Sequence, residues 1–268
     1  MIRLLSTDFD GTLADFPGTG PCVPELASEL EAVVRTDGLW VVNTGRSVEA
    51  ALEGLELLQA PVTPHYLLTS ERHVHKPDGR GGWSDFGDWN ALCRDHHDRL
   101  FDECGRFFEN VETLVASREG LVMQRNASGV PEGMIARTEE QLDEATAALM
   151  SLPARPADFH YQRSSIYLRF CHRAYDKGSA LAELSRLLDM PTSGILTVGD
   201  HQNDIPMLFG DVAAMVACPA NAHPEVKRAV TEAGGHVSEL ETGRGTAEAI
   251  HLYRTGVKRP AGKFVRQS

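Results

Sequence analysis

Short apolar runs alternate with amphipathic helical patterns at both ends of the chain, and this alternation constrains the fold more than any other feature. The first part reads strand, helix, strand, helix, strand over residues 2–7, 25–34, 39–43, 48–58 and 65–69. The second part predicts helices over 177–188, 204–209, 221–233 and 246–253 and strands over 194–198 and 212–216. Strands joined through single helices pair in parallel with right-handed crossovers, so the sequence predicts an α/β fold with a parallel sheet.

The alternation of strand and helix patterns is interrupted between about residues 77 and 172. The glycine-rich stretch 79–82 indicates a turn or linker. Helix patterns over 88–104 and 139–150 and short strand patterns over 121–124, 159–163 and 166–171 follow it. We interpret this segment as an α+β module inserted into the sheet domain. We therefore expect a core domain of residues 1–76 and 173–268 and an inserted domain of residues 77–172.

The 268-residue chain is acidic, with 26 Lys and Arg against 38 Asp and Glu and a formal net charge of −12. This charge repels nucleic-acid phosphates and anionic membranes, so a phosphate ligand needs a local cation, a metal ion or a helix N-terminus. No apolar stretch approaches the roughly 20 residues that span a bilayer. The five cysteines are odd in number and widely spread, which is typical of a reducing compartment. We expect a cytoplasmic protein, a monomer or a weak homodimer, without nucleic-acid or membrane partners.

Two acidic residues directly follow the first strand pattern. Asp8 and Asp10 are separated by one residue, and Gly11 after them lets the chain turn. The carboxyl ends of strands in open α/β sheets form the crevice where ligands bind. A pair of carboxylates there can hold a hard dication, or divide the roles of nucleophile and proton carrier. An Asp-rich turn without chemistry is the alternative for this motif alone.

Two further motifs begin helices and offer groups that bind an anion. Thr44 and Gly45 lie between a strand and a helix, where a hydroxyl and backbone N–H groups form a seat for a phosphate. Ordinary helix capping explains the same two residues. Lys177 begins the helix at 177–188, where a cation opposes the helix dipole. The unfavourable position of this charge suggests that Lys177 faces an anion.

The fourth motif, over residues 199–204, follows the strand at 194–198. It contains Asp200 and Asp204, four residues apart, with Asn203 between them. Acids crowded at the edge of a sheet repel each other unless a cation compensates them. A divalent metal is the simplest explanation for this second pair of carboxylates.

The order of the four motifs resembles motifs one to four of the haloacid dehalogenase superfamily. The stretches are Asp8-Phe9-Asp10-Gly11-Thr12, Thr44-Gly45-Arg46, Lys177-Gly178 and Gly199-Asp200-His201-Gln202-Asn203-Asp204. The run Asn221-Ala222-His223-Pro224-Glu225-Val226-Lys227 is similar to a segment of the Cof-type and sucrose-phosphate phosphatase-like branch. The resemblance implies a Rossmann-like core and an inserted cap of type C2, similar to C2B. Relatives often have Asn-Gly after the third strand, where this chain has Ser70-Glu71-Arg72.

The resemblance also implies catalytic and metal-binding roles. Asp8 is then the nucleophile that forms an aspartyl-phosphate, and Asp10 protonates the leaving alcohol and later activates water. Mg²⁺ is held by Asp8, the Asp10 backbone carbonyl and Asp200. Asp204 is a fourth acid at the metal or a partner behind its ligands.

The phosphoryl group is assigned, by the same resemblance, to residues of the second, third and fourth motifs. Thr44 bonds a phosphoryl oxygen, and Gly45 belongs to the same seat. Lys177 screens both the nucleophile and the transferring group, and Asn203 orients Lys177 or the phosphate.

The carboxylate at position 10 distinguishes among activities within the superfamily, because phosphonatases and transport ATPases that share the pattern lack it. Its presence favours hydrolysis of a phosphate ester or phosphomutation, and mutases typically carry another type of cap. We therefore expect a Mg²⁺-dependent phosphatase that hydrolyses a small phosphorylated metabolite, a sugar phosphate. The alternatives are a phosphomutase and a non-catalytic protein that binds a phosphorylated metabolite.

Overall fold

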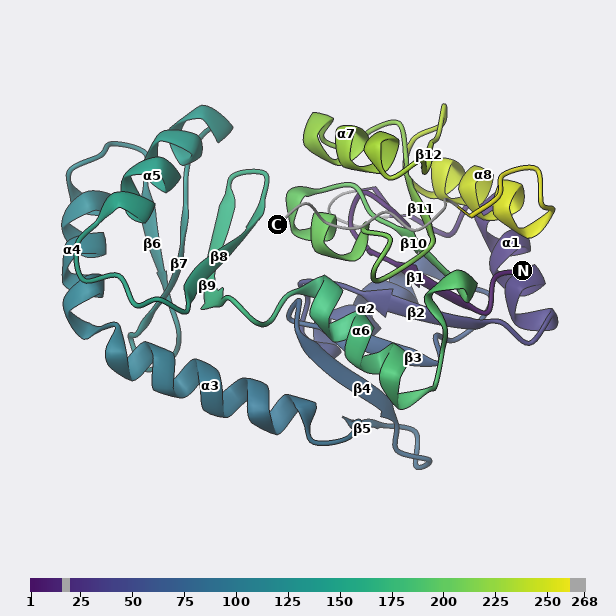
Figure 1. Ribbon diagram of the computed structural model, residues 1–268, viewed down its shortest axis with the longest axis horizontal. Coiled ribbons are helices and arrows are strands. Elements are labelled where there is room, and N and C mark those ends of the chain that lie inside the picture. Colours follow the sequence, from purple (N-terminus) through teal and green to yellow (C-terminus); the bar gives the residue numbers. More distant parts are fainter. Residues whose placement is uncertain (16–19, 261–268) are drawn as a thin grey trace. The chain divides into compact units, whose positions relative to one another are not determined.

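The computed structural model describes residues 1–15 and 20–260, and the chain divides into two units (Figure 1). The first unit comprises Met1–Asn90 and Asp176–Ser268, and the second comprises Ala91–Tyr175. We predicted the first boundary at residue 76, but the first unit continues to Asn90. The reason is that β4 (His73–Pro77) and β5 (Trp83–Asp85) pair with the sheet of the first unit.

Among the described residues, eight strands form the sheet of the first unit. Their spatial order is β12 (His236–Val237), β11 (Met215–Cys218), β10 (Ile195–Val198), β1 (Leu4–Thr7), β2 (Leu39–Asn43), β3 (Tyr66–Thr69), β4 and β5. The strands from β12 to β3 pair in parallel, whereas β4 and β5 are antiparallel. Thr7 is in register with both Val198 and Val42, so β10, β1 and β2 end at the same level.

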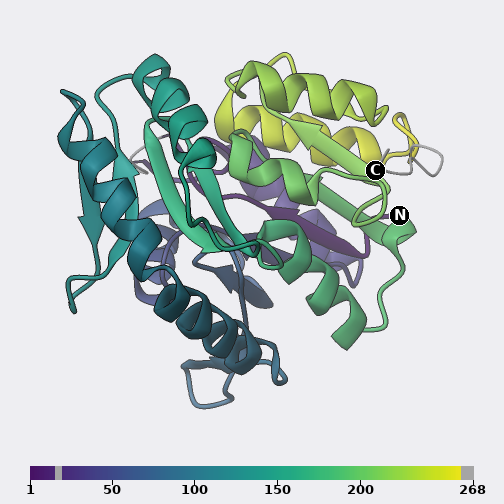
Figure 2. The same cartoon turned by 60° about the vertical axis from the view of Figure 1, so that its left-hand side comes forward.

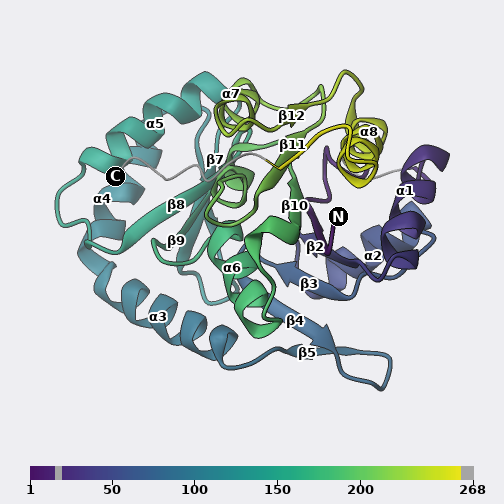
Figure 3. The ribbon, with the colours of Figure 1, turned by 45° about the vertical axis from the view of Figure 1, so that its right-hand side comes forward.

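Helices cover both faces of this sheet. One face packs against α1 (Pro24–Arg35), α2 (Val48–Leu58) and α8 (Thr242–Arg254). Figure 3 shows α1 and α8 side by side. The other face packs against α6 (Lys177–Leu187), η2 (Gln202–Met207) and α7 (Pro224–Glu232). The short turn η1 (Thr192–Gly194) directly precedes β10. Consecutive residues of a strand point to opposite faces, so Leu4 and Leu5 of β1 lie in different cores. The predicted α/β class is confirmed.

The second unit has its own antiparallel sheet and hydrophobic core (Figures 1 and 2). The spatial order is β6 (Val122–Arg125), β7 (Pro131–Ile135), β9 (Tyr167–His172) and β8 (Phe159–Ser164). The helices are α3 (Trp89–Glu103), α4 (Gly105–Ala116) and α5 (Glu139–Ser151). Phe107 of α4 meets Phe159 of β8 with ring centroids 4.6 Å apart. This unit is the α+β module that the sequence predicts.

Several element boundaries differ from the prediction. The strand predicted at 212–216 lies at β11, because the N–H groups of Val212 and Ala213 both donate to the Phe209 carbonyl and form a turn. The helix predicted from Asn221 begins at Pro224, the first position that suits proline. The short helix predicted at 204–209 is a 3₁₀ turn. Helix α4 and strand β7 were not predicted. Among the described residues, no helix is both long enough and apolar enough to cross a membrane.

Candidate active site

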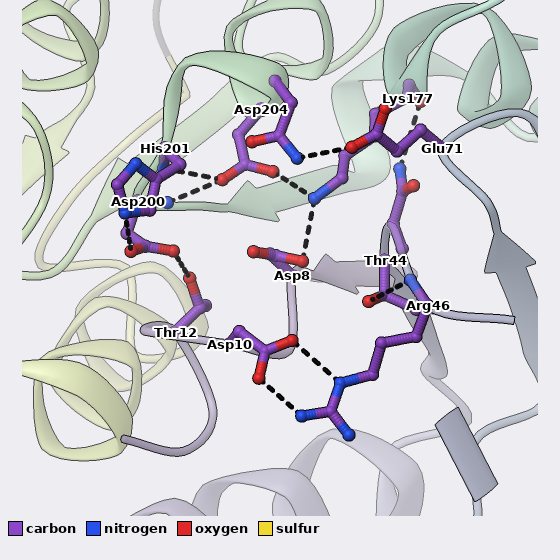
Figure 4. Close-up of polar contacts among 12 residues, drawn as sticks. Asp8, Asp10, Thr12, Thr44, Arg46, Glu71, Lys177, Asp200, His201 and Asp204 are labelled. Atoms are coloured by element: carbon purple, nitrogen blue, oxygen red, sulfur yellow. Dashed lines mark hydrogen bonds and ion pairs between the residues drawn. The ribbon is translucent and has the colours of Figure 1, made fainter. Parts of the chain in front are cut away.

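The predicted site residues gather where the parallel strands end (Figure 4). Asp8 directly follows β1, Thr44 directly follows β2, and Asp200 follows β10 by two residues. Lys177 is the first residue of α6, and Asp204 lies in η2. These strands are neighbours in the sheet, so residues far apart in sequence meet at one edge.

Lys177 is fully buried and bridges two of the acids. Its Nζ donates to Asp8 Oδ1 at 2.8 Å and to Asp204 Oδ1 at 2.6 Å. The Asn43 amide holds the backbone at this point by donating to the Lys177 carbonyl at 3.0 Å. Asp176 caps the helix by accepting from the Ser179 N–H at 2.7 Å, which offsets a cation in the first turn. The prediction that Lys177 faces anions is confirmed by these contacts.

Asp204 fixes the loop that carries Asp200. Its Oδ2 accepts the backbone N–H groups of Asp200 at 2.8 Å and His201 at 2.9 Å. Asp200 Oδ1 accepts from the Thr12 hydroxyl at 2.9 Å. Gly11, with a φ of +74°, lies so close that a Cβ there would be 2.1 Å from Asp200 Oδ2. Only glycine permits this close approach of the Asp10 turn to Asp200.

The electrostatics of this cluster indicate an excess of negative charge. Oxygens of Asp8, Asp200 and Asp204 lie within 4.8 Å of one another, and all three residues are buried. Burial, and then the charge of Asp204, raise the pKa of Asp8 well above its ordinary value, and the same causes raise the pKa of Asp200 to about 7. Burial alone would lower the pKa of Lys177, but the charges of Asp204 and Asp8 outweigh it and raise that pKa. A hard divalent cation fits this oxygen-only set.

Asp10 is directed away from the three buried acids, toward Arg46 (Figure 4). Arg46 Nε donates to Asp10 Oδ2 at 2.8 Å, and its NH2 nitrogen donates to Oδ1 at 2.6 Å. The Thr44 hydroxyl oxygen accepts the Arg46 backbone N–H at 3.2 Å. We did not predict the contact between Arg46 and Asp10. The only sequence signal for it was the presence of Arg46 in the second motif.

Asn203 contacts Glu71, a residue that was not among the predicted site residues. Its Nδ2 donates to Glu71 Oε1 at 2.9 Å, and its Oδ1 has no hydrogen-bond partner among the described residues. No hydrogen bond therefore joins Asn203 to Lys177, and a contact with the phosphate stays a prediction. Glu71 is buried, and its Oε1 would lie 3.0 Å from a Cβ at Gly45. Ser70 and Glu71 both have positive φ values, +50° and +65°. The tight turn after β3 thus places a carboxylate beside the predicted phosphate seat.

Replacement of Gly178 by alanine is expected to disturb the site, because the new Cβ would lie 2.2 Å from the Pro206 carbonyl oxygen. Helix α6 would have to shift against η2, and Lys177 would shift with it. We expect a loss of about 1 to 3 kcal/mol in the free energy of unfolding, measured in urea. An unchanged free energy would contradict a tight fit between α6 and η2.

Comparison with known proteins gives one family and several relatives. The family described as haloacid dehalogenase-like hydrolase matches residues 119–248. A curated relative, a phosphoglycolate phosphatase from Methanothrix thermoacetophila, is 33% identical over 117 residues. That match covers 43% of this chain and 49% of the relative, so the chain spans about half the length of the relative that it matches.

Solved structures share the fold over nearly the whole chain. The sucrose-phosphatase from Synechocystis, solved with sucrose and phosphate, is 20% identical with a TM-score of 0.68, and the match covers 94% of this chain and 98% of that one. BT1666 from Bacteroides thetaiotaomicron, described among phosphatases of the haloalkanoate (HAD) enzyme superfamily, is 17% identical with a TM-score of 0.63, and the match covers 96% of each chain. The family match includes the third and fourth of the four motifs, and the solved structures share the fold that the resemblance implied.

Proposed function

We propose that this chain is a Mg²⁺-dependent phosphatase of small phosphorylated metabolites, of the haloacid dehalogenase-like hydrolase type. The observation that carries the proposal is the buried cluster of Asp8, Asp200 and Asp204 around the Lys177 ammonium. Three carboxylates and one ammonium leave an excess negative charge at the edge of the sheet where ligands bind. A divalent cation would neutralise that charge and attract a phosphate ester.

The contacts within the cluster suggest which acids hold the metal. Asp8 and Asp200 present carboxylate oxygens to the cluster, and the Asp10 backbone carbonyl belongs to the same turn. Both oxygens of Asp204 are already engaged, by Lys177 and by two backbone N–H groups. This supports a role for Asp204 behind the ligands. Bound Mg²⁺ would neutralise the charge that develops on the transferring phosphoryl group.

The residues of the chain then divide the reaction between them. The Asp8 carboxylate attacks phosphorus, and the bond from phosphorus to the alcohol oxygen breaks as an aspartyl-phosphate forms. Asp10 gives a proton to that oxygen, then takes one from the water that attacks the intermediate and releases inorganic phosphate. Lys177 holds Asp8 in place, while Thr44 and Gly45 offer a hydroxyl and N–H groups to the phosphoryl oxygens.

For the substrate we propose a sugar phosphate. The similar protein from Synechocystis is a sucrose-phosphatase, and its fold matches nearly the whole chain. The curated relative from Methanothrix is named for phosphoglycolate, a carboxylic acid instead of a sugar. The net charge of −12 supports an enzyme that acts without a nucleic-acid or membrane partner, and we propose a monomer or a weak homodimer in the cytoplasm.

Removal of the metal is expected to abolish turnover. We expect the protein treated with a chelator to release no phosphate from p-nitrophenyl phosphate, and added Mg²⁺ to restore release. Mg²⁺ should also raise the melting temperature, because it binds the folded cluster and not the unfolded chain. Asp200→Asn should lose most of this shift. Full activity of the chelated protein would contradict the proposed role of the metal.

A panel of phosphorylated sugars and sugar acids, read by release of phosphate, tests the substrate class. Preference for a sugar phosphate over phosphoglycolate is the expected result. Conversion of a phosphosugar into its isomer without release of phosphate would instead identify a phosphomutase. Binding of the same compounds without any turnover would identify a non-catalytic binding protein.

A further inference from the structure

We propose that Arg46 is the positioning residue for Asp10, and that Gly54 of helix α2 makes the space in which Arg46 does so. This inference rests on the proposed phosphatase function and adds to it. Arg46 belongs to the second motif, but the resemblance implies no role for it, and Gly54 lies outside all four motifs. The contacts of the guanidinium carry the inference (Figure 4).

Arg46 holds Asp10 through two parallel hydrogen bonds. The bonds from Nε to Oδ2 and from the NH2 nitrogen to Oδ1 measure 2.8 Å and 2.6 Å. This fork fixes the plane and direction of a carboxylate, which a single bond from a lysine does not. A carboxylate has about four lone-pair sites, so the fork leaves a site on each oxygen for proton transfer.

The guanidinium is itself held on two other sides. Its NH1 nitrogen donates to the Ala50 carbonyl of α2 at 3.2 Å, and its Cζ lies 4.5 Å from the centroid of the Phe9 ring. The pKa of Arg46 is raised, first by its hydrogen bonds to Asp10 and despite partial burial. All three nitrogens therefore have partners within the protein, which argues for positioning instead of direct capture of the phosphate.

Gly54 explains how the guanidinium fits against α2. A Cβ at this position would lie 2.6 Å from the Arg46 NH1 nitrogen and 2.8 Å from the Phe9 ring. Glycine weakens the interior of a helix relative to alanine. Gly54 lies where Arg46 and Phe9 approach the helix, and the missing side chain leaves room for both. The chain of contacts thus runs from Gly54 through Arg46 to Asp10.

The test compares two esters whose leaving groups differ in their need for a proton. Phenyl phosphate needs protonation of a basic phenoxide, whereas p-nitrophenyl phosphate releases a stable anion without it. We expect Arg46→Met to lower kcat/KM for phenyl phosphate about 100-fold and for p-nitrophenyl phosphate less than about tenfold. Arg46→Lys, which keeps the charge without the fork, should lie between Arg46→Met and the wild type. Inhibition by inorganic phosphate should stay within about twofold.

Gly54→Ala tests the same inference without replacing a charged residue. It should show the same preference for p-nitrophenyl phosphate, with a smaller loss on phenyl phosphate. Gly105→Ala is the matched control, because Gly105 also lies in a helix and has open space where the Cβ would be. In an Asp10→Asn background, Arg46→Met should add little further loss, since Arg46 acts through Asp10.

Several results would overturn the inference. Equal losses on both esters would reduce Arg46 to a general structural role, and weaker inhibition by phosphate would make it a phosphate-binding residue. Additive losses with Asp10→Asn would break the link between the two residues. Turnover of neither ester by the wild-type protein would overturn the proposed function itself, and the Arg46 inference with it. A melting curve of each variant shows whether the protein is folded at the assay temperature, so that a loss of activity is not mistaken for unfolding.

Discussion

Replacement of Asp8 by asparagine is expected to reduce turnover of p-nitrophenyl phosphate by at least about 10⁴-fold, since the amide cannot act as the nucleophile. Asparagine has nearly the shape of aspartate, so the cluster around it should persist. The measurement is phosphate release with saturating Mg²⁺. The Asp37→Asn variant, on an exposed turn of the first unit, is the matched control and should keep wild-type activity.

Without metal, the free energy of unfolding of Asp8→Asn should be at least as large as that of the wild type. Burial and the charge of Asp204 raise the pKa of Asp8. The ionised form of this carboxylate therefore destabilises the folded protein relative to the unfolded chain. Asparagine removes that cost, although it also loses an ion pair with Lys177. Wild-type activity in Asp8→Asn would refute the assigned nucleophile. A strong loss of stability would refute the account of excess negative charge.

The sequence could predict which residues gather at this edge of the sheet, because most of the candidate site residues follow a buried strand closely or begin a helix. Parallel strands that end at one level bring Asp8, Thr44 and Asp200 together whatever the intervening loops do. The carboxylate and hydroxyl groups of these three residues can be read directly from the sequence. Lys177 was recognisable for a related reason, since a cation in the first turn of a helix opposes the helix dipole unless an anion lies nearby.

The contacts between side chains could not be predicted in the same way. Asp10 and Arg46 are 36 residues apart, and Asn203 and Glu71 are 132 apart. Both contacts depend on how turns direct side chains, and a residue pattern carries no such information. The fork on Asp10 needs the space at Gly54, and the position of Glu71 depends on positive φ values at two residues that rarely adopt them.

The prediction of some element boundaries was wrong for similar reasons. Strands β4 and β5 contain histidine, lysine, proline and aspartate, so their sequence does not have the apolar alternation of a core strand. They nevertheless extend the sheet, because strand pairing at an edge needs only backbone groups. Because β4 and β5 belong to the first sheet, the predicted domain boundary came too early. Strand β7 was missed for another reason: it contains both Pro131 and Gly133, two residue types that weaken a strand prediction.

Replacement of Lys177 by methionine is expected to have the largest effect on stability of any single substitution at the site. Asp8 and Asp204 would remain buried without their ammonium, and a broken buried ion pair typically costs about 3 to 5 kcal/mol. Turnover should also fall strongly, because the phosphoryl group loses its neighbouring cation. The free energy of unfolding in urea, measured without metal, gives the first effect directly.

Two further variants separate the ion pair from the packing of the side chain. Lys76→Met removes an exposed lysine and should change the free energy of unfolding by less than about 0.5 kcal/mol. Combining Lys177→Met with Asp204→Asn should recover part of the lost stability, because it removes one of the two unpaired carboxylates. Mg²⁺ should also stabilise Lys177→Met more than the wild type, since it supplies the missing positive charge. Equal stability of Lys177→Met and wild type without metal would mean that the cluster is not held by this ammonium, and the charge argument for the site would then fail.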